Sequence, residues 1–175
     1  MRTLMNWHDH FTLDRTTGTL YWRERPRSMF RTDRGWRTFN SQRANKAITC
    51  SRRGYLIVRL FNKLYQVHRI VFEMANDQTL GDNDVDHRDG NQSNNVPSNL
   101  RSATVSQNLM NTRMRSDNTS GLKGVYWSVG RNKWFAKLVV AGRQIHLGYH
   151  ETRGLAAVAR AKGAIRYHGQ FARFT

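Results

Sequence analysis

The spacing of hydrophobic and polar positions changes along the chain, and each spacing predicts a different kind of element. Short runs at residues 11–14 and 19–22 flank Thr17-Gly18 and predict a β-hairpin. Residues 23–46 show no clear period and mix arginines with aromatic residues. We interpret this segment as an irregular basic arm, which either becomes ordered on DNA or is a solvated surface loop.

A second pair of runs, at residues 54–60 and 64–67, predicts another hairpin, and apolar positions three and four residues apart predict a helix directly after it. Residues 84–87 and 99–103 are expected to form two strands joined by a loop rich in Asn, Asp, Gly and Ser. The T-x-x-Q pattern at residues 104–107 is a helix capping box, so a helix is expected to follow.

The last third of the chain predicts a small sheet covered by one helix. Three strand-like runs, at residues 124–129, 133–140 and 143–149, are separated by turns. Thr152 is placed to cap a helix whose apolar positions share one face. The expected fold class is therefore α+β, with a C-terminal three-stranded antiparallel sheet packed on one helix.

The charge composition of the chain indicates what kind of molecule it binds. The 175 residues carry a formal charge of +17, more than solubility requires, and such a surface attracts nucleic acid through Coulomb forces and counterion release. Residues 1–53 hold 12 Lys/Arg against 4 Asp/Glu, residues 118–175 hold 10 against 1, and residues 54–117 hold 7 of each. This distribution indicates that the flanks hold the polyanion while the neutral middle keeps carboxylates for another task.

Cysteine content and hydropathy exclude several classes of protein. The single cysteine, Cys50, excludes a disulfide framework within the chain and a multi-Cys zinc site. The chain has no run of about 18 apolar residues and no signal-peptide core. We therefore expect a soluble, cytoplasmic protein with no membrane partner.

The residues that suggest chemistry stand at a particular spacing. Asp86-His87 is followed by Asn99, 12 residues after the histidine, and by Asn108, 9 residues later. A compact strand–loop–strand–helix unit can bring all four to one cleft. Asp86 and Asn108 offer the oxygen ligands that suit Mg²⁺ or Mn²⁺, and zinc is not expected. His87 can act as a base near pH 7, and Asn99 is placed to fix its ring by a hydrogen bond.

One geometric difficulty is that neighbours on an ideal strand point to opposite faces. Asp86 and His87 therefore share a site only if the strand ends or twists there, which the following loop with Gly90 makes reasonable. The alternative is an Asp-His pair in a polar loop that has no chemical role.

The stretch from residue 54 to residue 111 resembles the HNH homing and nicking endonucleases of phages and introns, which have a ββα-metal (His-Me finger) core. The resemblance is carried, in matching order and spacing, by Val67-His68-Arg69-Ile70-Val71, Asp86-His87-Arg88-Asp89-Gly90-Asn91, Asn94-Asn95, Asn99-Leu100-Arg101 and Gln107-Asn108. It implies that His87 activates the attacking water and that Asn99 orients His87. It also implies that Asp86 and Asn108 bind one divalent metal ion. His68 is expected to be a packed structural histidine, and Asn94 and Asn95 are expected to shape the loop.

Residues 119–174 resemble the APETALA-like DNA-binding domain of plant ethylene-response factors, which also occurs fused to phage HNH nucleases. The matching segments are Ser120-Gly121-Leu122-Lys123-Gly124-Val125-Tyr126-Trp127, Lys133-Trp134-Phe135-Ala136-Lys137-Leu138, Leu147-Gly148-Tyr149-His150-Glu151-Thr152 and His168-Gly169-Gln170-Phe171. The resemblance implies that the sheet lies in the major groove of DNA and that the helix braces its back. The plant family has arginines and a tryptophan where this chain has other residues, so its base preference does not transfer.

Alternation along the predicted strands divides their side chains between a DNA-facing side and a core. Tyr126, Gln144 and His146 are candidate DNA contacts on the first of these faces. The candidate phosphate contacts are Arg131, Lys133, Lys137 and Arg143, against the alternative of ordinary solvated charges. The side chains expected in the core are Val125, Trp127, Trp134, Leu138, Ile145 and Leu147.

These inferences predict a basic arm with a hairpin at residues 1–53, an HNH nuclease at 54–117 and an APETALA-like domain at 118–175. The expected function is magnesium-dependent hydrolysis of phosphodiester bonds in double-stranded DNA, with 5′-phosphate and 3′-hydroxyl products. We expect a monomeric, site-preferring nicking or homing enzyme that acts in the host bacterial cytoplasm if a phage encodes it. The competing hypotheses are a DNA-binding regulator with an inactive nuclease core and a structured-RNA binder.

Overall fold

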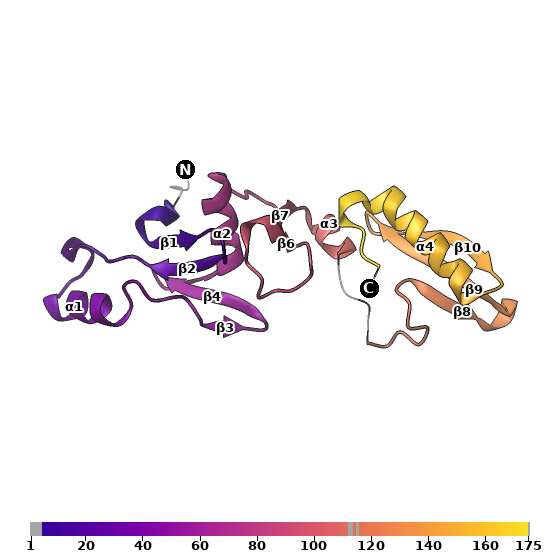
Figure 1. Cartoon of the computed structure of the whole chain (residues 1–175), viewed down its shortest axis with the longest axis horizontal. Coiled ribbons are helices and arrows are strands. Elements are labelled where there is room, and N and C mark those ends of the chain that lie inside the picture. Colours follow the sequence, from indigo (N-terminus) through magenta and orange to yellow (C-terminus); the bar gives the residue numbers. More distant parts are fainter. Residues whose placement is uncertain (1–4, 112–113, 115, 175) are drawn as a thin grey trace. The chain divides into compact units, whose positions relative to one another are not determined.

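The computed structural model describes residues 5–111, 114 and 116–174, and the chain divides into two compact units (Figure 1). The N-terminal unit is Met1–Ser102 and the C-terminal unit is Ala103–Thr175. Both mix helices with antiparallel strands, as an α+β protein does. The division differs from the predicted domain boundaries, because residues 103–117 group with the C-terminal sheet.

The N-terminal unit contains small sheets and two α-helices. Its strands are β1 (Phe11–Asp14), paired with β2 (Thr19–Trp22), the meander β3 (Ser51–Arg52), β4 (Tyr55–Leu60) and β5 (Lys63–Gln66), and the pair β6 (Asp84–His87) and β7 (Leu100–Ala103). Its helices are α1 (Asp33–Gln42) and α2 (Val67–Asn76), with 3-10 turns at Trp7–Asp9, Arg27–Met29 and Pro97–Asn99. Both predicted hairpins and the predicted helix after them are confirmed.

One hydrophobic core holds the N-terminal unit together. It combines Phe11, Leu20 and Trp22 of the first hairpin with Val67 and Ile70 of α2, each at most 7% exposed. Complete burial of side chains of this size stabilises a fold by about 1.5–3 kcal/mol each, before conformational entropy is subtracted. The core therefore joins residues 1–53 to the segment that follows them.

The turn of the first hairpin approaches the β6–β7 loop closely. Gly18 has a φ of +70°, and a Cβ at this position would lie only 2.1 Å from the carbonyl oxygen of Asn95. A larger residue would therefore force the two segments apart. Asp14 shapes the turn, because its carboxylate accepts hydrogen bonds from the hydroxyls of Thr16 and Thr17. These hydrogen bonds also lower the pKa of the Asp14 carboxyl to about 2.

The interpretation of residues 23–46 as irregular is wrong for α1. Thr32 caps this helix, and Trp36 donates its indole N–H to the Arg25 carbonyl at 3.0 Å. The Arg25 guanidinium lies over the Phe39 ring, 4.3 Å from its centroid. None of the residues of α1 is buried. The helix meets the core through Phe39, which is partly buried and packs against it.

The C-terminal unit is a sheet backed by a helix. Its elements are α3 (Val105–Met110), β8 (Val125–Ser128), β9 (Lys133–Val140), β10 (Arg143–His150) and α4 (Arg153–His168), with the antiparallel strands in the order β10-β9-β8. Val125, Ala136 and Ala156 form the centre of the core. The predicted capping box of α3 and the Thr152 cap of α4 are both present. None of the helices among the described residues has the length and apolar character needed to cross a bilayer.

The predicted core of this sheet needs one correction. Val125 and Leu138 are buried as expected, but Trp127 is 44% exposed. It lies on β8, an edge strand, and packs edge-on against Trp134 with ring centroids 5.2 Å apart. Strand alternation assigns a side to Trp127, but it does not say how far α4 extends over the sheet edge.

A buried ion pair joins β6 to β7. The Asp86 carboxylate accepts a hydrogen bond from Nε of Arg101 at 2.7 Å and lies 2.6 Å from Nη2. Both side chains are at most 7% exposed. In such surroundings each charge stabilises the other, and removal of one partner of a buried pair is strongly destabilising.

We expect Arg101→Met to lower the free energy of unfolding by roughly 3–5 kcal/mol, because Asp86 then stays buried without this cation. The exposed neighbour Arg88 supplies the matched control, and Arg88→Met should change stability little. Urea unfolding followed by circular dichroism measures both. Equal stability of the two variants would contradict a structural role for the pair.

The histidine of α2 is also buried. His68 is 4% exposed, and its ring lies 5.1 Å from that of Tyr55 and 5.0 Å from that of His87, between centroids. Burial is the main cause that lowers the pKa of His68 from its ordinary 6.5 to about 3, and electrostatic interactions with His87 and Arg69 add to it. This agrees with the expectation of a packed structural histidine that stays neutral.

The lowered pKa predicts a loss of stability in acid. As the pH falls below 6.5, the unfolded chain protonates His68 and the folded chain does not, until the pH reaches about 3. The free energy of unfolding should therefore fall with decreasing pH, by up to about 1.4 kcal/mol per pH unit from this group. His68→Gln should flatten this dependence in urea unfolding, whereas the exposed control His8→Gln should keep it. Identical pH profiles for the two variants would refute the assignment.

Candidate active site

β6 brings two candidate residues into the interior of the N-terminal unit. Asp86 and His87 are 4% and 5% exposed. The strand ends at His87, and Gly90, with a φ of +68°, turns the chain and donates its N–H to the His87 carbonyl at 2.8 Å. If Asp86 and His87 are to share one site, the strand must end near His87, and β6 ends there.

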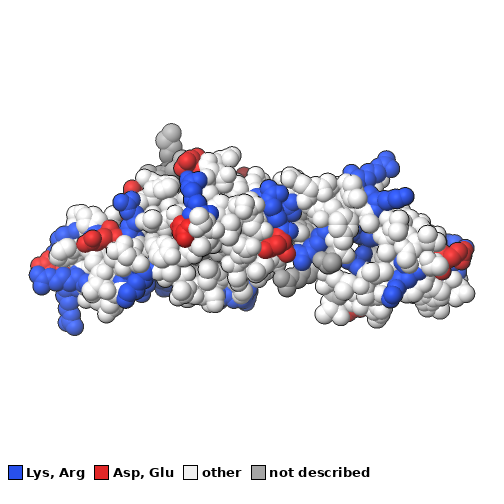
Figure 2. Space-filling model, viewed as in Figure 1, with Lys and Arg blue, Asp and Glu red and all other residues white. Residues whose placement is uncertain are grey.

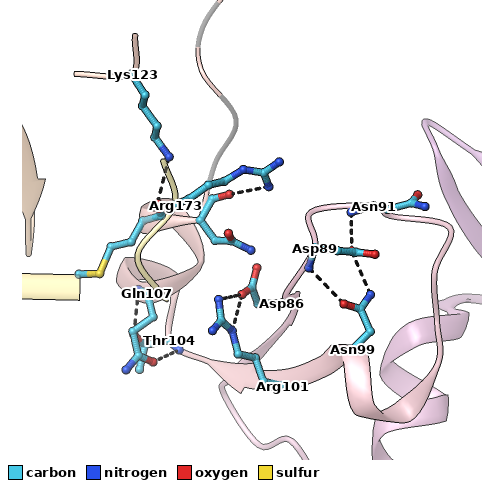
Figure 3. A network of polar contacts seen from close by, with 11 residues as sticks. Asp86, Asp89, Asn91, Asn99, Arg101, Thr104, Gln107, Lys123 and Arg173 are labelled. Carbon is cyan, nitrogen blue, oxygen red and sulfur yellow. Dashed lines mark hydrogen bonds and ion pairs between the residues drawn. The ribbon is translucent and has the colours of Figure 1, made fainter. Parts of the chain in front are cut away.

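The two neighbours have different surroundings. Asp86 points to Arg101 on β7, as Figure 3 shows. His87 lies near the rings of His68 and Tyr55, at 5.0 and 6.3 Å between centroids. Arg101 was part of the motif that the sequence singled out, but its contact with Asp86 was not foreseen.

His87 is held by an amide of the loop. Its Nε2 lies 3.0 Å from Oδ1 of Asn95, and both side chains are buried. An amide oxygen only accepts, so this contact places the ring hydrogen on Nε2 and makes Nδ1 the basic nitrogen of the neutral ring. Asn95 is therefore the residue that orients His87 in this structure, and the sequence had assigned it only to loop shape.

Asn99, predicted to orient His87, forms hydrogen bonds with the β6–β7 loop (Figure 3). Its Oδ1 accepts the N–H of Asp89 at 3.1 Å, and its Nδ2 donates to Oδ1 of Asp89 at 3.0 Å and to the carbonyl of Asn94 at 2.8 Å. The backbone carbonyl of Asn99 also accepts the N–H of Arg88. Asn99 therefore closes the loop that carries Asn95 and acts on His87 only through it.

Asp89 is the acidic centre of this loop. Burial acts to raise its pKa, but hydrogen bonds from Asn91, Asn94 and Asn99 outweigh burial and hold the pKa below its usual range. The carboxylate thus stays ionised near neutral pH and keeps the loop closed.

Asn108, the second predicted metal ligand, lies on α3 in the C-terminal unit. The end of α3 is fixed by two cations, which Figure 3 shows. Lys123 Nζ donates to the Met110 carbonyl and Arg173 Nη1 donates to the Asn111 carbonyl, both at 3.3 Å. Asp86 and Asn108 thus belong to different compact units, and their pairing as ligands rests on the sequence.

The candidate ligands fit a hard divalent cation by their chemistry. A carboxylate and a side-chain amide both offer the oxygen donors that Mg²⁺ and Mn²⁺ prefer. Clusters of three or more His, Cys, Asp or Glu side chains suited to a metal ion are absent from the part of the chain that the structure describes.

Several predicted DNA contacts form one row on the C-terminal sheet. Tyr126 stacks on Phe135 at 5.4 Å, and Phe135 stacks on His146 at 5.7 Å with an 8° angle between the rings. Lys137 Nζ lies 4.9 Å from the centroid of the Tyr126 ring. Tyr149, which sequence reasoning missed, lies 4.7 Å from His146. A bulge between those two residues brings it to the same face.

The remaining predicted contacts lie at the edges of this row. Arg131 lies over the Tyr149 ring at 4.7 Å, and Lys133 pairs with Glu151 at 2.8 Å. Arg143 and Gln144 are exposed where β10 begins. On the face that Figure 2 shows, Lys and Arg are more widespread than Asp and Glu in both units.

Comparison with known proteins identifies the central motif. The family described as HNH endonuclease matches residues 65–110, which include all four predicted nuclease residues. Protein 3.8 of Escherichia phage T7 is 36% identical over 115 residues, which are 65% of this chain and 93% of that protein. A structure titled "DNA binding and cleavage by the HNH homing endonuclease I-HmuI" aligns with a TM-score of 0.39 and 20% identity, over 91% of this chain and 85% of the other. The chain therefore belongs to the same family as phage T7 protein 3.8 and contains an HNH endonuclease domain.

Proposed function

We propose that this protein is a metal-dependent endonuclease that hydrolyses phosphodiester bonds of double-stranded DNA. The observation that carries the proposal is the match of the HNH endonuclease family to residues 65–110, the segment in which His87 is buried and oriented by Asn95. The basic charge of the chain, +17, supports a polyanionic substrate.

In the proposed reaction His87 is the general base. Nδ1 takes a proton from the attacking water, while Asn95 holds the ring through Nε2. Because the pKa of His68 is lowered to about 3, its ring stays neutral, and a proton on His87 meets no second charged imidazole at 5.0 Å. Cleavage would leave 5′-phosphate and 3′-hydroxyl ends.

Asp86 and Asn108 are the proposed ligands of one divalent ion, Mg²⁺ or Mn²⁺. When bound, this ion would offset the negative charge that grows on the scissile phosphate and on the leaving 3′-oxygen. Arg101 is a positioning residue, because it holds one carboxylate oxygen of Asp86 at 2.7 Å. Asn99 keeps its proposed place in the site by closing the β6–β7 loop.

The C-terminal sheet is the proposed DNA-binding surface, in the manner of an APETALA-like domain. Tyr126, Gln144 and His146 would face the bases, and the four cations Arg131, Lys133, Lys137 and Arg143 would face phosphates. One active site per chain favours a monomer that nicks one strand at a preferred site, in a host cell if a phage encodes the protein.

We expect His87→Ala to abolish conversion of supercoiled plasmid to open circle in Mg²⁺, because the water then lacks its base. Binding of the same DNA should be unchanged in a mobility-shift assay. The exposed control His8→Ala should nick like the parent protein, and EDTA should stop both. Nicking by pure His87→Ala protein would overturn the proposal, and a parent protein that binds DNA without cleaving it would favour the regulator. Stronger competition by structured RNA than by DNA would favour the RNA binder.

We expect the double variant Lys133→Ala, Lys137→Ala to bind DNA with a shallower dependence of log affinity on log salt concentration. Each lost phosphate contact reduces the slope by about 1. Lys162→Ala, an exposed change on α4, should leave the slope nearly unchanged. Fluorescence anisotropy with a labelled duplex over a salt series measures this. Equal slopes for the double variant and the parent would remove these lysines from the interface.

A further inference from the structure

Arg160, on α4, is a buried cation that forms no ion pair with the residues that the structure describes. Its side chain is 6% exposed, and its Nε and Nη1 have no hydrogen-bond partner among the residues that the structure describes. Burial lowers the pKa of the guanidinium, although arginine stays charged at any physiological pH. A buried ion in this state costs several kcal/mol unless an anion or another acceptor reaches it.

The chain makes room for this guanidinium at a glycine. Gly124 has a φ of +72°, and a Cβ there would lie 2.6 Å from Nε of Arg160. Only glycine combines this backbone conformation with so close an approach. The position of Arg160 is therefore built into the start of β8.

Arg160 lines a pocket of about 500 Å³ within the C-terminal unit. Among the described residues, the charged side chains that line the pocket are the cations Lys123, Lys137 and Arg160 and the acid Asp117. Burial and the charges of Arg160 and Arg173 lower the pKa of Lys123 to about 8. Arg160 and Lys123 thus repel each other, and an anion of more than one charge would relieve this repulsion.

The other residues that line the pocket indicate the chemistry of the rest of the ligand. Leu109, Met110 and Leu138 supply apolar surface, and Tyr126 supplies an aromatic ring. His168 also lines the pocket, and its Nε2 bonds to the carbonyl of Val139 at 3.0 Å. This bond requires hydrogen on Nε2 and leaves Nδ1 as an acceptor, which is buried and has no partner in the described structure. The pocket therefore suits an apolar or aromatic body that carries an N–H or O–H donor.

We propose that this pocket binds an organic phosphate of nucleotide size, with the phosphate on Arg160 and the base against the apolar walls. Pockets of about 300–1,000 Å³ enclose ligands of this size. Arginine binds phosphate through charge-assisted N–H donors, and Arg160 has two donor atoms, Nε and Nη1, without a hydrogen-bond partner among the described residues. This site is separate from the nuclease chemistry and does not depend on it.

The nucleotide has two possible sources, a free mononucleotide or a nucleotide of a DNA strand. Tyr126 and Lys137 line the pocket and also belong to the aromatic row of the sheet. A strand that contacts the row would therefore pass beside the pocket.

The test is isothermal titration calorimetry in EDTA, where no cleavage occurs, with deoxythymidine 5′-monophosphate as the probe. We expect Arg160→Met to weaken binding about tenfold or more, because a charge-assisted hydrogen bond is lost. Arg160→Lys, which keeps the charge and the stem, should lose part of the affinity. Arg166→Met, an exposed change on the same helix, should bind like the parent. Equal affinity in Arg160→Met and the parent would overturn the proposal.

Further probes separate phosphate from base and one source from the other. Inorganic phosphate and thymidine should each bind at least tenfold more weakly than the mononucleotide, and equal binding of either would overturn the assignment. A short single-stranded oligonucleotide that binds in an Arg160-dependent way, while the mononucleotide does not, would assign the site to a DNA strand. If neither the mononucleotide nor the oligonucleotide binds in an Arg160-dependent way, the proposed site is refuted. Ligand-free Arg160→Met should be no less stable than the parent, since it removes an unpaired buried charge, and a large loss of stability would identify Arg160 as a structural strut instead.

Discussion

Withdrawing a carboxylate from water is costly unless its charge is paired, and the architecture around β6 depends on the pairing of Asp86 with Arg101. The pair spans two neighbouring strands, so the direction of Asp86 is set by the pairing of β6 with β7. The same pairing brings Asn99 beside the loop that starts after His87. The pairing that satisfies one buried charge thus also positions the loop between β6 and β7, which carries Asn95.

Much of this architecture could be predicted from the sequence, because its elements have strong local signals. The hairpin turn at Gly18, the apolar spacing of α2 and the Thr104 capping box are all read from a few neighbouring residues. Fold class, motif position and helix starts follow from such signals. The core contacts of Phe11 and Trp22 have no such local signal, since they connect residues far apart in the chain.

The finer assignments failed where several similar side chains compete for one position. Asn94, Asn95 and Asn99 all lie within reach of the same loop, and their spacing does not say which amide faces the imidazole. That choice depends on the path of the backbone through the 3-10 turn Pro97–Asn99. Tyr149 was missed for a related reason, because a bulge alters the alternation on which the sequence argument depends.

The close approach of Gly18 to Asn95 has a consequence for any attempt to move this nuclease motif into another protein. The matched segment begins at residue 65, yet the backbone of Asn95, whose side chain aligns the histidine, lies against the turn at Gly18, outside that segment. A graft of residues 65–110 alone would keep every residue of the motif and lose the support behind it. The smallest transplantable nuclease would therefore include the first hairpin. This hairpin contributes no chemical group, but it supports the loop whose Asn95 orients His87.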